Sequence, residues 1–310
     1  MHPNNNKLLL LMSMLLILSF MIISSNSPLL IWFWMEMGNM MFIMMILSVQ
    51  ANLISSSMTM MIIQFMSSTL IIISQLSMFL PNLMTIGVSM KLGLFPFHMW
   101  MPMILVKSPW LICFILMTIH KLPPFMFINY INSPTLLLII ITITPITITL
   151  KLMYTFNAKI ILGLSSSIHS SWMSLCMVHS TQLWAIYFSL YTINLYMTCL
   201  LIKSKYMNSP MFNLKKKSIL MMVLLSSVGS PPFIGFLGKA MMMSKSFPSM
   251  WLPMMSLIMS SALSLVFYSR ILLSLISHPL PIQITLINNM NKKKIMNKFW
   301  IIILLSMMIT

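Results

Sequence analysis

The sequence predicts an all-α membrane protein, a polytopic bundle of about eleven transmembrane helices in a single membrane domain that covers residues 1–310. Hydrophobic residues make up 59% of the chain and charged residues only 6%, far below the roughly 25% of a soluble domain. Apolar runs of about 18 to 22 residues recur along the chain, and each is long enough to cross the ~30 Å hydrocarbon layer as a helix. The runs lack the polar alternation of a barrel strand, so helices are expected.

The apolar runs define the predicted spans in order. The first follows Lys7 and is kept as a helix because no small-residue cleavage site of a signal peptide comes after it. The second opens at Pro28, and the seventh is rich in serine. The last is only twelve residues, so ten or eleven spans are expected. The predicted spans are residues 8–24, 28–48, 58–80, 83–101, 109–131, 134–150, 160–178, 182–202, 218–244, 250–276 and 299–310.

The positive charges predict how the bundle is oriented. The chain has a formal net charge of +17, and thirteen of its eighteen basic residues lie in the turns before odd-numbered spans. On the opposite side only Lys245 lies in a turn. The positive-inside rule therefore places the N-terminus in the cytoplasm or matrix. Because the basic residues are strung between apolar spans, nucleic acid is not an expected partner.

No metal, redox or nucleotide site is expected in the chain. The three cysteines, Cys113, Cys176 and Cys199, lie singly in apolar runs without the spacing of a zinc or iron–sulfur site. The segment 235–240 resembles a phosphate loop only faintly, because it lacks the four-residue spacer and the Ser or Thr after the lysine.

Four ionisable residues inside the predicted spans are the main candidates for a proton relay: Glu36, Lys91, Lys121 and Lys239. Glu36 is the only acidic residue of the chain. An ionisable group at the centre of a membrane helix costs about 2.5 to 3.5 kcal/mol, so it is typically functional and paired. The alternative is snorkelling to the membrane surface. Lys91 and Lys121 are too deep for it, whereas Lys239 lies near the end of its span and its burial stays open.

Each candidate lysine lies beside residues that break helices. Irregular backbone at membrane depth is tolerated where it lines a hydrated cavity, and broken helices mark ion routes in transporters. The fourth and ninth spans would then be counterparts in two five-helix repeats, residues 8–131 and 134–276, followed by a short helix at 299–310. The prolines at the predicted breaks are Pro96, Pro123, Pro124, Pro231 and Pro232.

Two histidines are secondary relay candidates, because imidazole titrates near neutral pH. His169 lies among serines in the seventh span, and His120 directly precedes Lys121. Arg270, near the end of the tenth span, is interpreted as a structural residue.

Three motifs carry a resemblance to a known family. Residues 91–102 (KLGLFPFHMWMP), 120–124 (HKLPP) and 229–239 (GSPPFIGFLGK) resemble the subunit 2 family of mitochondrial NADH:ubiquinone oxidoreductase, complex I. The likeness extends from Ser25 through Trp34 and Glu36 to the segment ending at Arg270, nearly the whole chain.

The resemblance implies an antiporter-like, proton-translocating subunit in the mitochondrial inner membrane, with a matrix N-terminus and no redox chemistry of its own. Glu36 would be the carboxylate, Lys91 its paired lysine, Lys121 the central lysine and Lys239 the exit-side lysine. NADH, FMN, iron–sulfur clusters and ubiquinone are expected in partner subunits. The implied partners are other complex I membrane subunits, including sister antiporter-like subunits, and membrane lipids such as cardiolipin.

The chain departs from the family pattern in three places. It has no acid after the Pro-Phe-His motif, His120 stands where glutamine is usual, and Ala158 and Lys159 replace a basic pair. Two other functions remain open. A stand-alone cation/proton antiporter would favour additional acids within the membrane, and a structural membrane subunit would use its polar residues only to hold helices together.

Overall fold

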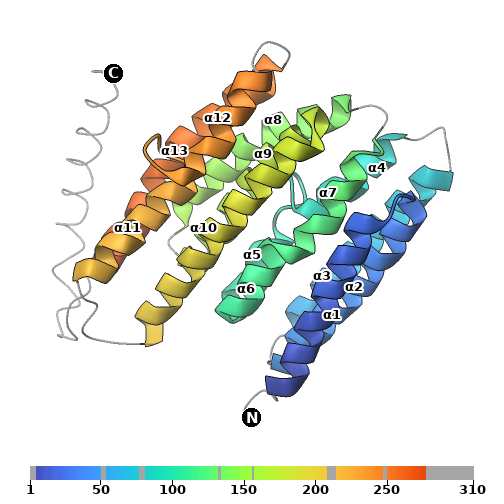
Figure 1. Ribbon diagram of the computed structural model, residues 1–310, viewed down its shortest axis with the longest axis horizontal. Helices are drawn as coiled ribbons and strands as arrows, with labels where there is room; N and C mark the ends of the chain where they lie inside the picture. Colours follow the sequence, from blue (N-terminus) through green and yellow to red (C-terminus); the bar gives the residue numbers. More distant parts are fainter. Residues whose placement is uncertain are drawn as a thin grey trace. The chain divides into compact units, whose positions relative to one another are not determined.

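The computed structural model describes residues 5–49, 54–76, 81–131, 134–155, 157–207, 214–246 and 250–276, and every regular element in these ranges is a helix (Figure 1). The predicted all-α fold class is therefore confirmed over the described residues. The predicted short helix at 299–310 lies outside them.

The first half of the chain contains a three-helix group followed by two interrupted spans. Helices α1, α2 and α3 lie side by side in Figure 1, and α3 packs along α4. The helices are α1 (Asn5–Ser24), α2 (Pro28–Val49), α3 (Ile54–Leu76), α4 (Pro81–Leu92), α5 (Trp100–Lys107), α6 (Trp110–Met117), the 3-10 helix η2 (Ile119–Lys121) and α7 (Leu122–Ile128).

The second half contains long helices and one interrupted span. Helix α9 contacts helices of both halves, among them α5, α7, α10 and α12. The helices are α8 (Thr135–Tyr154), α9 (Ala158–His179), α10 (Thr181–Met207), α11 (Leu214–Val228), α12 (Ile234–Ser246) and α13 (Trp251–Ile276).

Ten of the predicted spans correspond to described helices. Within the described residues, eight segments are long and apolar enough to cross a membrane. The other two predicted spans, the fourth and the ninth, are each divided into two shorter helices, α4 with α5 and α11 with α12. The third span begins at Ile54, four residues before its predicted start, and its predicted end lies outside the described residues.

The two divided spans are interrupted in the same way, at glycines. Gly93 has a φ of 67° and Gly229 a φ of 79°, in the left-handed region that side chains with a Cβ rarely adopt. At the first break the amide of Leu94 donates to the carbonyl of Ser89, and the amide of Ser230 donates to that of Leu225 at the second. The amide of Gly93 donates to the carbonyl of Met90, and the amide of Gly229 donates to that of Ser226. Each break therefore forms a Schellman motif, which satisfies carbonyls at a helix end.

The break near Lys121 lies at Thr118, five residues before Pro123, the first of the two prolines at which it was predicted. Helix α6 ends at Met117, and the next residue, Thr118, leaves the helical region with a φ of −118° and a ψ of −83°. The chain then forms η2, and Pro123 and Pro124 fall in the first turn of α7. Proline is tolerated there because the first amides of a helix have no partner within it.

Helix α9 is the most buried of the candidate spans. In its 18-residue apolar stretch 89% of the residues are buried, against 17% in that of α1. Serines occupy much of its surface, and small residues let neighbouring helices approach closely in a membrane. Ser165, Ser166, Ser171 and Ser174 each donate their hydroxyl to a carbonyl of the same helix, so these buried hydroxyls are satisfied. This polar helix therefore forms the interior against which the candidate site is built.

Candidate functional site

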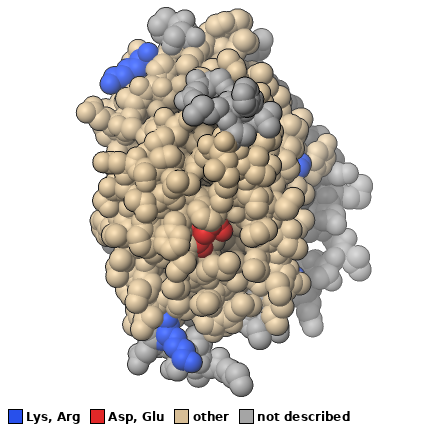
Figure 2. All heavy atoms as spheres, turned by 90° about the vertical axis from the view of Figure 1, so that its right-hand side faces the viewer, with Lys and Arg blue, Asp and Glu red and all other residues tan. Residues whose placement is uncertain are grey.

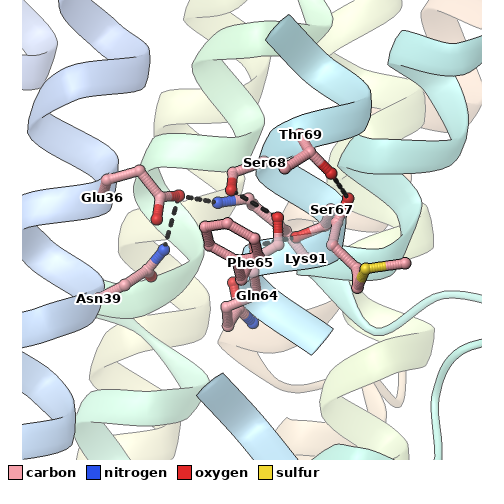
Figure 3. A network of polar contacts seen from close by, with 9 residues as sticks. Glu36, Asn39, Gln64, Phe65, Ser67, Ser68, Thr69 and Lys91 are labelled. Carbon is pink, nitrogen blue, oxygen red and sulfur yellow. Dashed lines mark hydrogen bonds and ion pairs between the residues drawn. The ribbon is translucent and has the colours of Figure 1, made fainter. Parts of the chain in front are cut away.

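Glu36 and Lys91 form an ion pair between α2 and α4. The Nζ of Lys91 lies 2.7 Å from Oε1 of Glu36, and the lysine side chain is 1% exposed against 19% for the glutamate. The amide of Asn39, one turn further along α2, donates to the same Oε1 at 3.1 Å (Figure 3). The carboxylate therefore accepts hydrogen bonds from two buried donors.

Close packing of α3 against α4 shapes the surroundings of Lys91. Gly87 lies one turn before the lysine, and a Cβ there would stand 2.8 Å from the carbonyl oxygen of Ser67. The glycine thus lets the α3 backbone approach, and Figure 3 places Gln64, Ser67 and Ser68 beside Lys91. The predicted proximity of Glu36 and Lys91 is present, and α3 adds a polar wall that the sequence analysis did not identify.

The Glu36 carboxylate reaches the surface of the described chain. Figure 2 shows it in the middle of a face whose surrounding side chains are uncharged, whereas Lys91 is buried. Exposed apolar side chains on the same helix include Phe33, Met37 and Met40. A carboxylate in such surroundings is costly when it faces acyl chains.

Lys121 is held by α9. Its Nζ donates to the carbonyl of Ser166 at 2.9 Å, to the hydroxyl of Ser166 at 3.1 Å and to the hydroxyl of Ser170 at 2.7 Å. The lysine side chain is buried, and all three acceptors are neutral. Because the only acidic side chain of the chain, Glu36, pairs with Lys91, no carboxylate among the described residues balances Lys121.

Lys239 is buried in the second divided span, which answers the question that the sequence left open. Its side chain extends from α12 to the end of α11, where Nζ donates to the carbonyl of Val228 at 2.6 Å. The ammonium also lies 5.6 Å from the centre of the Trp172 ring on α9. A cation at a helix C-terminus interacts favourably with the helix dipole, so the break itself supplies the binding site for Lys239.

His169 joins α9 to α10 and α11. Its Nδ1 lies 3.0 Å from the hydroxyl of Tyr187, and its Nε2 lies 3.0 Å from the carbonyl of Ser227, the residue before Val228. The imidazole therefore contacts the same helix end that receives Lys239. A small cavity of about 30 Å³ adjoins the histidine and is lined in part by Asn194 and Tyr268.

His120 lies on η2 beside Lys121, with its ring between those of Phe42 and Trp100. Both ring nitrogens are buried and have no hydrogen-bond partner in the described chain. Within the described residues no direct hydrogen bond joins Lys91 to Lys121, or Lys121 to Lys239.

Two lysine contacts were missed by the sequence analysis. Lys151, at the end of α8, lies against Nε2 of His98, in the loop between α4 and α5. Lys159 donates to the carbonyl of Ser108 at 2.6 Å and lies over the ring of Trp110. No spacing in the sequence brings these residues together, because they belong to different spans.

The described residues contain no group of three or more His, Cys, Asp or Glu side chains that could hold a metal ion. Cys113, Cys176 and Cys199 are buried free thiols.

Comparisons with known proteins place the chain among membrane subunits. Residues 72–264 match the family described as NADH:quinone oxidoreductase/Mrp antiporter, TM. This region includes Lys91, Lys121, His169 and Lys239, and Glu36 precedes it.

Curated relatives carry one common name, NADH-ubiquinone oxidoreductase chain 2. The protein from Rhipicephalus sanguineus is 31% identical over 273 residues, which cover 84% of this chain and 86% of the relative. The protein from Locusta migratoria is 29% identical over 241 residues, covering 69% of each chain. The protein from Gallus gallus is 33% identical over 201 residues, covering 61% of this chain and 58% of the relative.

Two solved structures share the fold. A chain of respiratory complex I from Thermus thermophilus with bound aureothin has a TM-score of 0.76 at 17% identity, covering 89% of this chain and 72% of that chain. A chain of the membrane-bound sulfane sulfur reductase, an archaeal respiratory membrane complex, has a TM-score of 0.70 at 16% identity, covering 85% and 65%.

Proposed function

Because the chain belongs to the NADH:quinone oxidoreductase/Mrp antiporter transmembrane family, we propose that it is a proton-translocating membrane subunit of respiratory NADH:ubiquinone oxidoreductase, complex I. The observation that carries the proposal is the burial of Lys91, Lys121 and Lys239, each bonded to a different helix of the bundle. Buried lysines in a membrane protein are typical of proton relays.

The Glu36–Lys91 pair is the element that responds to a signal from outside the chain. A carboxylate in contact favours the charged form of a lysine, and burial disfavours that form when the carboxylate is removed. Opening the contact therefore changes how readily Lys91 holds its proton. Lys121 is the next site, because its neutral acceptors can bond either an ammonium or an amine.

The proton then passes toward Lys239, which releases it on the opposite side of the membrane. His169 lies on α9 one residue before Ser170, which bonds Lys121. It also contacts the end of α11 that receives Lys239. The cavity beside His169 is large enough to hold water, which can complete the connection.

The energy for transport comes from partner subunits. Moving one charge against the membrane potential costs about 2.3 kcal/mol per 100 mV. We assign NADH oxidation, FMN, the iron–sulfur clusters and ubiquinone reduction to those partners. The chain's own part is to move protons in response to them.

The face that carries Glu36 is the proposed contact with a neighbouring membrane subunit. Its carboxylate is partly exposed among apolar side chains (Figure 2), where a protein partner removes the cost of contact with lipid. Complex I membrane subunits, including sister antiporter-like subunits, are the proposed partners. Anionic lipids such as cardiolipin would bind the lysines at the membrane surface.

The proposed location is the mitochondrial inner membrane with the N-terminus in the matrix. The lysine distribution supports the orientation, and the names of the curated relatives support the compartment. The two matching Schellman motifs support a division into five-helix repeats, residues 8–131 and 134–276, in which α4 and α11 are counterparts.

The function is tested by isolating the chain with its neighbours. Membranes are extracted in mild detergent, intact assemblies are resolved on a native gel, and mass spectrometry identifies what migrates with this chain. Co-migration with flavin and iron–sulfur subunits is expected. Migration alone or as a small oligomer would contradict the proposal and favour a stand-alone cation/proton antiporter.

A further inference from the structure

Trp172 on α9 contacts the buried lysine of the second divided span. The tryptophan is fully buried, and the centre of its ring lies 5.6 Å from the Nζ of Lys239, whose side chain is also buried. A cation within about 6 Å of an aromatic ring is attracted to the negative face of the ring, most strongly when the ring is tryptophan. A neutral amine lacks this attraction, so the ring distinguishes the two protonation states of Lys239.

The break between α11 and α12 leaves room for the lysine beside this ring. The Nζ of Lys239 donates to the carbonyl of Val228 at 2.6 Å, and a Cβ on Gly229 would stand only 3.1 Å from the same nitrogen. Glycine at this position therefore lets the lysine lie across the end of α11. The carbonyl accepts an N–H from an ammonium or an amine, whereas the ring face favours the ammonium alone.

The indole N–H of Trp172 does not explain why tryptophan stands at this position. Its Nε1 is buried and has no hydrogen-bond partner among the described residues, although buried polar atoms are almost always paired. An aliphatic side chain would fill the same space without leaving an N–H unpaired. The contact between the ring face and Lys239 is what an aliphatic side chain could not provide.

Trp172 has in the second half of the chain the place that Glu36 has in the first. In the proposed repeats α9 is the second helix of its half, as α2 is of the other, and each contacts the lysine of the divided span in its own half. Glu36 holds Lys91 with a carboxylate, and the chain has no second acid for Lys239. An aromatic ring is an uncharged group that still prefers a cation.

We propose that Trp172 is a positioning residue for Lys239: its ring face holds the ammonium over the end of α11 and lets the neutral amine move away. The inference rests on the proposed function for its effect on transport, but not for the contact itself. In the relay, Lys239 lies against the ring while it carries a proton and leaves the ring once the proton is released. Trp172 itself neither gains nor loses a proton.

The contact is tested by cryo-electron microscopy of the intact membrane assembly, at a resolution that shows side chains. In the native complex, density for Lys239 is expected between the Val228 carbonyl and the face of the Trp172 ring. In Trp172→Met, which fills the space with a flexible side chain but has no ring, the lysine is expected to move off the end of α11. A native Lys239 that points away from the ring, or an unchanged Lys239 in Trp172→Met, would overturn the proposal.

The effect on transport is tested with two variants of Trp172 and a matched control. Trp172→Phe keeps a ring face and is expected to retain most of the native ratio of protons to electrons, whereas Trp172→Met is expected to lower it. Trp184→Met is the control, because Trp184 is also buried with an unpaired Nε1 but its ring lies against Phe125 and Phe188. Equal ratios in the two Trp172 variants, or an equal loss in Trp184→Met, would overturn the role of the ring face.

Lys239→Met separates this inference from the proposed function. If Lys239→Met abolishes transport and Trp172→Met keeps the native ratio, the role of Trp172 is overturned and the proposed function stands. A native ratio in Lys239→Met would instead contradict the place of Lys239 in the proposed relay. If Trp172→Met does not assemble, the position of Lys239 in the native complex decides, and a lysine away from the ring overturns the proposal.

Discussion

The Nζ of Lys91 lies 2.7 Å from Oε1 of Glu36, although the two residues are 55 positions apart in the sequence. Glu36 is the only acidic residue of the chain, and among the described residues Lys91 is the lysine that pairs with it. Lys121 and Lys239 depend on hydroxyl and carbonyl oxygens instead. In the proposed relay, movement of Glu36 would therefore act directly on Lys91 and only indirectly on the other two lysines.

The ion pair leads to the first prediction, for Glu36→Gln. The variant keeps an acceptor for Asn39 but leaves Lys91 buried without a counter-charge, and removing one partner of a buried pair costs about 3 to 5 kcal/mol. Assembly of the complex should therefore decline, as measured by its yield on a native gel.

The double variant Glu36→Gln/Lys91→Met is the matched control. It removes both charges, so assembly is expected to recover while proton transport stays lost. Recovery of transport together with assembly would show that the pair has only a structural role.

Two serines on α9 provide a second prediction. Ser170 accepts a hydrogen bond from Lys121, whereas Ser174, one turn later, bonds only the carbonyl of Ser171 among its described contacts. A hydrogen bond to a charged group contributes about 1.5 to 3 kcal/mol. Ser170→Ala is therefore expected to slow coupled proton transport, and Ser174→Ala, which is equally buried, to leave it unchanged. Transport assays on reconstituted vesicles compare the two, and equal rates would contradict the role of Ser170.

Close packing at the second break leads to a third prediction. A Cβ on Gly235 would overlap the carbonyl of Ser226, so α12 can approach α11 only because this residue is glycine. Overpacking typically costs 1 to 3 kcal/mol, and backbone cannot move aside as a flexible side chain does. Gly235→Ala should lower the thermal stability of the detergent-extracted complex. Gly38→Ala should leave the melting temperature unchanged, because its added Cβ meets nothing within 4 Å. Equal melting temperatures for the two variants would contradict the close packing at Gly235.

The sequence predicted the helical bundle well because its signals are local. Runs of apolar residues identify spans wherever they occur, and ten of the predicted spans correspond to described helices. The breaks near Lys91 and Lys239 were also predicted, since Gly93 and Gly229 adopt conformations that few other residues tolerate. At Lys121 the prolines indicated a break, but proline is compatible with a first helical turn and the interruption precedes it.

The contacts between helices could not be predicted from the sequence. Nothing local shows that Lys239 extends back to the carbonyl of Val228, or that Ser170 faces Lys121, because both depend on how separate helices pack. The contact between Lys151 and His98 was missed for the same reason. Composition identified which residues are unusual in a membrane, and only the packing shows what each of them touches.

Proton transport by Lys121→Met in the reconstituted complex tests the central claim most directly. Methionine keeps the length and apolar volume of the side chain but removes the ammonium that bonds Ser166 and Ser170. The proposed function predicts a complex that assembles and retains its partner subunits, with fewer protons transported per electron. Normal assembly with a native ratio of protons to electrons would contradict it and leave the chain a structural subunit.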